Sequence, residues 1–133
     1  MKTADTSVLV AAFASWHEKH DLASAAIESG VRLVEHCAVE TYSVLTRLPA
    51  PHRAPAPLVR DFLVQRFPEP FLRMTPRAYR RFLRELAESQ VTGGAVYDAL
   101  IAATATAAGA ELVTCDRRAL LVYERYATHT RWL

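Results

Sequence analysis

The segment that decides the fold is GGAVYDALIAATATAAGAELVTCD, residues 93–116. Its first part is rich in alanine and contains a single charged residue, Asp98, which predicts a buried helix. Its last part, ELVTC at 111–115, is a short apolar run typical of a buried strand, and Asp116 follows it directly. A buried helix that leads into a buried strand is the repeating unit of an α/β protein with a parallel sheet.

The rest of the chain alternates in the same way. The predicted strands lie at 2–5, 31–36, 70–75, 111–115 and 128–133. The first predicted helix begins at Thr6 or Ser7. Further helices are predicted at 17–30, 38–48, 58–67, 76–90, 94–108 and 117–127, and a loop with four prolines lies at 49–57. We therefore expect an α/β fold that forms one domain over residues 1–133. Its mostly parallel central sheet would contain four or five strands flanked by helices.

Composition and charge are those of an ordinary globular protein. Half of the 133 residues are hydrophobic and 23% are charged. No apolar run is long enough to cross a membrane, and Asp5 interrupts what could otherwise resemble a secretory signal. With only two cysteines, Cys37 and Cys115, which lack metal-ligand spacing, we expect a cytoplasmic protein with reduced thiols. Fourteen of the sixteen basic residues are arginine, which suits phosphate contacts, although a coding bias explains this equally well.

Four acidic residues belong at the same edge of the predicted sheet. They follow the ends of strands or stand in the first turns of helices, and they are Asp5, Glu40, Asp98 and Asp116. Ligands of parallel α/β sheets bind outside this edge. Asp5 and Asp116 could equally be helix N-caps, and Glu40 could be a favourable charge near a helix N-terminus.

Asp98 is harder to explain by local structure. Its helical neighbours at three- and four-residue spacing include Ala95, Ile101 and Ala102, none of which can neutralise a carboxylate. Four clustered acids without matching lysines or arginines repel one another. Hard divalent cations with oxygen ligands relieve that repulsion, so the residues indicate a site for Mg²⁺ or Mn²⁺.

The same residues carry a family resemblance. The blocks TADTSVLVAAF, AVETYSVLTRL, GGAVYDALIAATA and LVTCDRRAL resemble the motif blocks of PIN-domain ribonucleases, and most closely those of the VapC toxins of bacterial toxin–antitoxin pairs. They run through nearly the whole chain in the family's order and spacing. The resemblance places the family's acidic quartet on Asp5, Glu40, Asp98 and Asp116, and its supporting hydroxyls on Thr6, Ser7 and Thr114. Cys115 stands where the family has alanine or another small residue.

The resemblance implies a Mg²⁺- or Mn²⁺-dependent endoribonuclease toxin. One or two ions would bridge the carboxylates and the scissile phosphate and activate a water for in-line attack, leaving 5′-phosphate and 3′-hydroxyl ends. Asp5 and Asp98 would be the central metal ligands, and Glu40 and Asp116 would complete the site. The implied partners are a tRNA, rRNA or mRNA substrate and a VapB-like antitoxin, with no membrane and a homodimer as the assembly. The apolar surface between helices 58–67 and 36–45 would receive an antitoxin helix.

Arginines offer a positive track for RNA. Helix 76–90 presents four of them at i, i+3, i+4 and i+7, namely Arg77, Arg80, Arg81 and Arg84, and two more, Arg117 and Arg118, adjoin Asp116. A solvated helix face explains the first cluster as well as RNA binding does. The same helix offers Tyr79, Phe82, Leu83 and Leu86 to the core.

Other classes fit the residues less well. A receiver-like module also binds Mg²⁺ through clustered acids but requires a lysine after a late strand, and no lysine follows Lys19. A metal-dependent phosphohydrolase of the dehalogenase type requires a second Asp two residues after the first, where this chain has Ser7. A catalytically silent PIN scaffold would lack one of the four acids.

Overall fold

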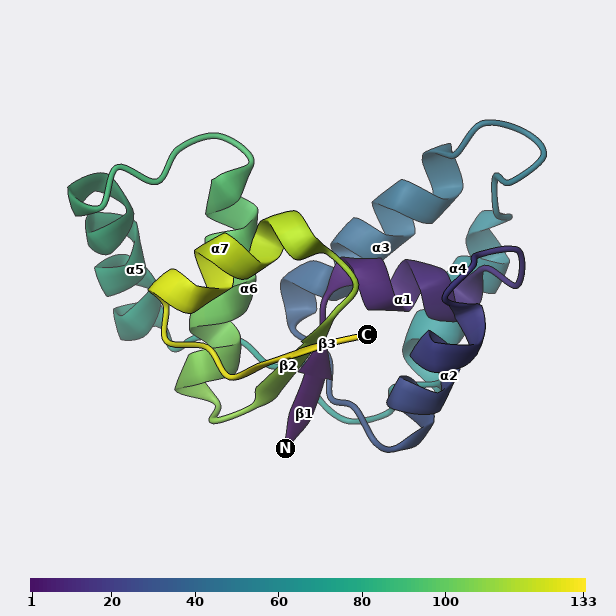
Figure 1. Cartoon of the computed structure of the whole chain (residues 1–133), viewed down its shortest axis with the longest axis horizontal. Coiled ribbons are helices and arrows are strands. Elements are labelled where there is room, and N and C mark those ends of the chain that lie inside the picture. Colours follow the sequence, from purple (N-terminus) through teal and green to yellow (C-terminus); the bar gives the residue numbers. More distant parts are fainter.

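Three parallel strands form the centre of the fold, and seven helices surround them (Figure 1). The computed structural model describes residues 1–133. The strands are β1 (Lys2–Ala4), β2 (Glu111–Thr114) and β3 (Thr130–Trp132), in that order across the sheet. The helices are α1 (Thr6–Phe13), α2 (His20–Glu28), α3 (Glu35–Arg47), α4 (Ala56–Gln65), α5 (Pro76–Glu88), α6 (Ala95–Ala107) and α7 (Arg117–Arg125). The expected α/β class with a parallel sheet is confirmed.

The register of the strands brings their carboxyl ends together. Ala4 of β1 lies opposite Val113 of β2, and Thr114 of β2 lies opposite Trp132 of β3. The ladder continues one residue past β1, since the Asp5 amide donates to the Val113 carbonyl at 3.1 Å. Asp5 and the residues that follow Thr114 therefore emerge side by side at one edge of the sheet.

The sheet is smaller than predicted, because segments 31–36 and 70–75 are not strands. They meet in a single parallel bridge between Val34 and Leu72. Helix α3 begins at Glu35, so the last two residues of segment 31–36 are helical. Segment 70–75 begins with Pro70, which has no amide hydrogen to donate to a β-ladder. The first segment still lies beside β1, where the Arg32 amide donates to the Lys2 carbonyl at 3.0 Å. The prediction of four or five strands was wrong, and three are present.

Local sequence signals explain where several helices begin and end. Asp5, Thr75 and Asp116 are N-caps, and each side chain accepts a hydrogen bond from a backbone amide in the first turn of its helix. Pro76 occupies the first position of α5, where its missing amide hydrogen costs nothing. After α6, Gly109 adopts a φ of +65°, which lets the chain turn back into β2.

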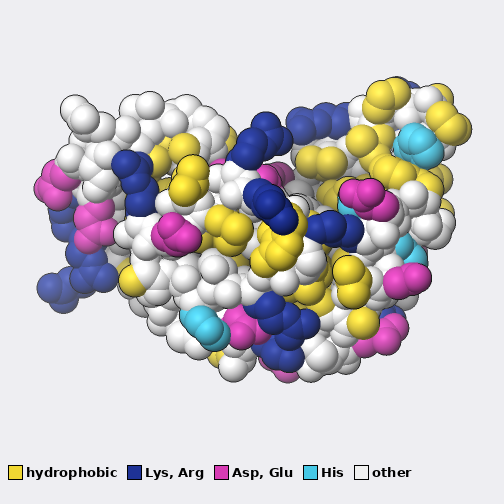
Figure 2. Space-filling model, in the orientation of Figure 1, with side chains coloured by type: hydrophobic (Ala, Val, Ile, Leu, Met, Phe, Trp, Pro, Cys, Tyr) yellow, Lys and Arg dark blue, Asp and Glu magenta, His cyan; other side chains and the backbone are white.

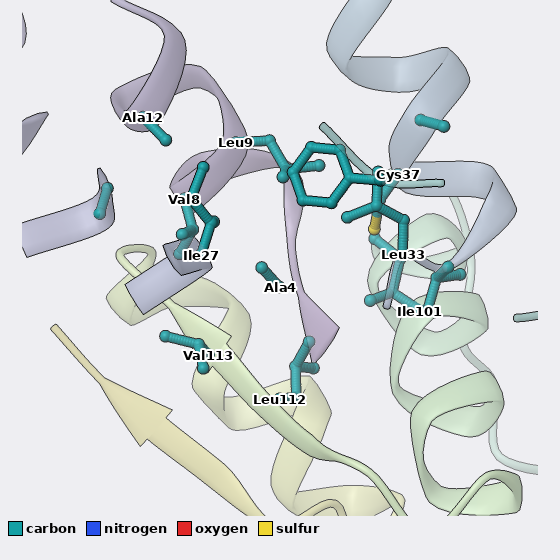
Figure 3. Close-up of a cluster of buried hydrophobic side chains, with 14 of the residues drawn as sticks. Ala4, Val8, Leu9, Ala12, Ile27, Leu33, Cys37, Ile101, Leu112 and Val113 are labelled. Carbon is teal, nitrogen blue, oxygen red and sulfur yellow. The ribbon is translucent and has the colours of Figure 1, made fainter. Parts of the chain in front are cut away.

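The main core lies between the sheet and the helices α1, α2, α3 and α6 (Figure 3). Figure 3 shows Val8 and Leu9 of α1 directed toward side chains of the sheet and of neighbouring helices. Val8, Leu9 and Leu112 are all completely buried. Burial of a Val or Leu side chain contributes roughly 1.5–3 kcal/mol, so this cluster is the main source of stability and fixes α1 against the end of β1.

Helix α5 lies outside this core, against α6 (Figure 1). Phe82 and Leu86 form a small cluster with Val91 and Ala99. Two side chains predicted to join the core are instead exposed, Tyr79 by 44% and Leu83 by 52%. Because α5 packs only on α6 and on the end of α7, it covers a narrow stripe of its surface, which leaves these two residues in solvent. None of the helices is both long and apolar enough to span a membrane.

Candidate active site

The four predicted acids line one hollow at the carboxyl edge of the sheet. Asp5 and Asp116 begin α1 and α7, whereas Glu40 and Asp98 stand in α3 and α6. The hollow has a volume of about 620 Å³ and also contains Thr6, Ser7, Lys19, Cys115, Arg118 and Tyr123. In Figure 2 the molecule is hollowed between the part formed by α6 and α7 and the part formed by α1 and α3, with Lys and Arg side chains around the opening.

Asp5 is the most buried of the four acids, with 3% of its surface exposed. Its Oδ1 accepts hydrogen bonds from the Ser7 hydroxyl and the Val8 amide, and its Oδ2 accepts one from the Tyr123 hydroxyl at 2.8 Å. Burial raises the pKa of this carboxyl, and the hydrogen bonds oppose that rise only in part. Both carboxylate oxygens are thus fixed in orientation at the bottom of the hollow.

Asp98 has no cationic partner anywhere in the structure, as its helical neighbours predicted. Partial burial, followed by the charges of Asp116, Glu40 and Asp5, raises its pKa to about 6, while His36 opposes the shift. The ordinary pKa of an aspartate is near 3.8. This carboxylate therefore stands in a field of like charges that the protein itself does not neutralise.

Glu40 and Asp116 are more exposed and are held by neighbours on their own helices. The Glu40 carboxylate lies 2.8 Å from Nε2 of His36, one turn earlier, and the His36 ring stacks on Tyr97 at 5.2 Å. Asp116 accepts a hydrogen bond from the Arg118 amide at 2.9 Å, which caps α7. The Arg118 guanidinium is 4.0 Å away and 97% exposed, so it screens Asp116 only weakly. Asp5 and Asp116 thus cap helices and also line the hollow.

The predicted hydroxyls surround the buried carboxylate. The Ser7 hydroxyl donates to Asp5 and accepts from the Cys115 amide at 2.9 Å, which ties α1 to the end of β2. Thr114 is fully buried and accepts a hydrogen bond from the Asp116 amide at 2.9 Å. Thr6 also lines the hollow, but its hydroxyl oxygen is buried and has no hydrogen-bond partner in the structure.

The donor set fits a hard divalent cation. Four carboxylates without an equal number of cations offer the oxygen ligands and the negative charge that Mg²⁺ and Mn²⁺ require. As the side chains stand, however, no group of three or more His, Cys, Asp or Glu residues is arranged to hold a metal ion. The chemistry of the hollow therefore suits such an ion, and side-chain rotation would have to bring the carboxylates together around it.

The predicted arginines divide into two groups. Arg118 borders the hollow, and Arg117 lies beside it with its guanidinium carbon 5.0 Å from the centre of the Trp132 ring. The four arginines of α5 are all exposed, and none borders the hollow; they are Arg77, Arg80, Arg81 and Arg84. Arg81 pairs with Glu85 on the same helix at 3.6 Å. The helical spacing correctly predicted an exposed basic face but could not tell where that face lies relative to the acids.

Four residues around the acids were not predicted. Tyr123 holds Asp5, His36 holds Glu40, and Lys19 and Trp132 form a cation–π contact at the rim. The sequence contains a signal for His36, which precedes Glu40 by four residues on one helix. Tyr123 lies 118 residues from Asp5, and no local pattern predicts that contact.

Comparison with known proteins agrees with this geometry. The family model described as PIN domain matches residues 3–125. Ribonuclease VapC40 of Mycobacterium tuberculosis is 54% identical over 121 residues, which cover 91% of this chain and 90% of that protein. Ribonuclease VapC27 of the same species is 42% identical over 127 residues, which cover 94% of this chain and 91% of that protein. The chain therefore belongs to the PIN-domain family, as a member of its VapC type.

Proposed function

We propose that the chain is an endoribonuclease toxin that hydrolyses RNA phosphodiester bonds with Mg²⁺ or Mn²⁺, and that residues 1–133 form its nuclease domain. The observation that carries the proposal is the gathering of four carboxylates at one hollow without an equal number of cations, with Asp5 and Asp98 in no ion pair. Structural acids are usually paired, and acids left unpaired at a ligand-binding edge indicate a functional site. The names of the two relatives, both ribonucleases, support the same activity.

Each acid has a role that its surroundings favour. Asp5 and Asp98 would be the central metal ligands, since one is rigidly oriented and the other lacks any partner. Glu40 and Asp116 would complete the site from the opposite helices, directly or through water. When bound, a divalent cation would stabilise charge on the scissile phosphate and promote deprotonation of the attacking water.

The chain's own residues would prepare the site for this chemistry. Ser7 and Tyr123 donate to Asp5 and hold its carboxylate in one orientation, so that little reorganisation is needed when the substrate binds. Thr6 would support the site from its buried side, and Thr114 orients the backbone that leads to Asp116. Arg118 would contact a phosphate at the rim. The products would have 5′-phosphate and 3′-hydroxyl ends.

The proposed setting is a cytoplasmic toxin–antitoxin pair. The substrate would be a tRNA, rRNA or mRNA, and a VapB-like antitoxin would hold a homodimer of the toxin inactive. The surface of the packed helices α3 and α4 exposes Val39, Tyr42 and Leu58 by 62%, 39% and 57%. Exposed apolar side chains on neighbouring helices suit an amphipathic helix from such a partner.

The test is RNA cleavage by the purified protein with Mg²⁺, with Mn²⁺ and with a chelator. Glu40→Gln removes one of the four carboxylate charges, and we expect it to lower cleavage by at least about tenfold, as loss of one group that stabilises the transition state does. Glu35→Gln is the matched control, because Glu35 lies on the same helix but pairs with Arg73 outside the hollow. Cleavage that persists in chelator, or equal losses in both variants, would contradict the proposal.

A further inference from the structure

Two cations, Lys19 of the hollow and Arg117 next to Asp116, are held by one aromatic ring. The ammonium nitrogen of Lys19 lies 4.0 Å from the centre of the Trp132 ring, and the guanidinium carbon of Arg117 lies 5.0 Å from the same centre. Both distances are within the range of a favourable cation–π contact. Trp132 thus brings together a residue that precedes α2 and a residue that begins α7.

The sheet explains why Trp132 stands at this place. In the register of β2 and β3, Trp132 lies opposite Thr114, two residues before Asp116. The next amide, that of Leu133, donates to the Thr114 carbonyl at 3.0 Å. Lys19 completes the arrangement, since its ammonium donates to the main-chain oxygen of Leu133 at 2.6 Å. The ring is therefore fixed at the same edge of the sheet as the four acids.

No side-chain carboxylate neutralises either cation. Neither Lys19 nor Arg117 forms an ion pair with an Asp or Glu side chain, although seven ion pairs or His–carboxylate contacts occur in the structure. Lys19 borders the hollow together with Arg118. An aromatic face attracts a cation without occupying its N–H donors, so the donors of Arg117 and the Lys19 donors that are not bonded to Leu133 remain available to an anion.

We propose that Lys19 and Arg117, positioned by Trp132, form a binding site for a backbone phosphate of RNA next to the phosphate that is cleaved. The proposal builds on the ribonuclease function above and adds the group that holds the strand. The acids at the bottom of the hollow repel a polyanion, and ordered cations at its rim offset that repulsion. Contacts to phosphate give affinity without sequence choice, so the site would bind RNA strands of different sequence alike.

Binding of RNA without cleavage tests the site directly. A short fluorescent single-stranded RNA is titrated with the protein in chelator, and anisotropy gives the dissociation constant at several salt concentrations. We expect Lys19→Gln to weaken binding about tenfold at low salt, as the loss of one charged contact does. The slope of the logarithm of the RNA association constant against the logarithm of the salt concentration should become shallower by about 0.7. Lys2→Gln is the matched control, because Lys2 is the only other lysine, and it bonds to Ser29 outside the hollow.

Substitutions of the ring test its positioning role. Trp132→Leu keeps an apolar side chain on β3 but removes the aromatic face, and we expect RNA binding to weaken about two- to fivefold. Trp132→Phe keeps an aromatic face and should recover most of the affinity. Trp16→Leu is the control, because Trp16 packs against His52 and does not line the hollow. Thermal melts of all variants show whether the fold around β3 is intact. RNA binding by Trp132→Leu and Trp132→Phe is then compared at a temperature at which both are folded.

The outcomes separate this proposal from the nuclease function. If Lys19→Gln binds RNA as Lys2→Gln does, with the same salt slope, the phosphate site is wrong even where the protein cleaves RNA. If Trp132→Leu and Trp132→Phe bind equally well, the ring does not position the cations. If the wild type binds RNA with the expected loss in Lys19→Gln yet cleaves nothing in Mg²⁺ or Mn²⁺, the phosphate site stands and the nuclease function fails.

Discussion

Replacing Asp98 with Asn should stabilise the protein at neutral pH while abolishing cleavage. The substitution keeps the size and shape of the side chain and removes one charge from a half-buried cluster of acids. Replacing a side chain that supports the fold lowers the free energy of unfolding. A charged side chain whose role is to bind a ligand instead destabilises the protein when the ligand is absent, so replacing it raises that free energy.

The magnitude follows from the pKa. The folded-state pKa of Asp98 is about 6, compared with 3.8 for the ordinary side chain. Because the folded state binds the proton more tightly, the charged group destabilises the fold increasingly as the pH rises from 3.8 through 6. The full difference corresponds to about 3 kcal/mol at pH 7.5, and solvent screening of this half-exposed group reduces it to roughly 1–2 kcal/mol. At pH 5 about half of that gain should remain.

Urea unfolding in chelator at pH 7.5 and at pH 5 measures this difference. We expect a higher free energy of unfolding for Asp98→Asn at both values and a smaller gain at the lower one. Asp61→Asn is the control, because Asp61 is exposed beside Arg60 and lies outside the hollow, so its effect should stay within about 0.5 kcal/mol. A destabilised Asp98→Asn protein, or a gain that does not change with pH, would refute the reasoning.

Three further predictions follow from the same contacts. Tyr123→Phe removes a hydrogen-bond donor from the buried Asp5 carboxylate, and urea unfolding should show a loss of about 1–3 kcal/mol; no loss would mean that the bond contributes nothing. Several millimolar Mg²⁺ should raise the melting temperature of the wild type but not that of Asp5→Ala, and equal shifts would locate the ion elsewhere. Leu45→Ala, at a fully buried position of α3, should lower the free energy of unfolding by about 2–5 kcal/mol, whereas Val39→Ala on the exposed face of that helix should change it by less than about 0.5 kcal/mol.

The class of the fold was predictable because its strongest signals are local. The runs that became β1 and β2 are short, and an aspartate that caps the next helix follows each of them within two residues. Segments 31–36 and 70–75 have a similar composition yet form only the bridge between Val34 and Leu72. An apolar run indicates burial, but whether it pairs over several residues depends on neighbours that are distant in the sequence.

The site was predictable in its acids and not in what surrounds them. Each acid follows a strand or stands near a helix start, and these positions converge at one edge of a parallel sheet. Their role as metal ligands stays a prediction. Tyr123 reaches the site because α7 packs beside it, and Trp132 because of the register of β3. Neither the packing nor the register can be predicted from the spacing of residues within one helix or strand. The basic face of α5 was visible in the sequence, but its position beyond α6 was not.

The central claim is that the four carboxylates of the hollow hydrolyse RNA with a divalent metal. The most direct measurement is cleavage of RNA by the purified wild type, Asp98→Asn and Asp61→Asn in Mg²⁺, with the ends of the products identified. We expect products with 5′-phosphate and 3′-hydroxyl ends from the wild type and from Asp61→Asn, and no products from folded Asp98→Asn. Cleavage by Asp98→Asn at the wild-type rate, or products with 2′,3′-cyclic phosphate ends, would contradict it.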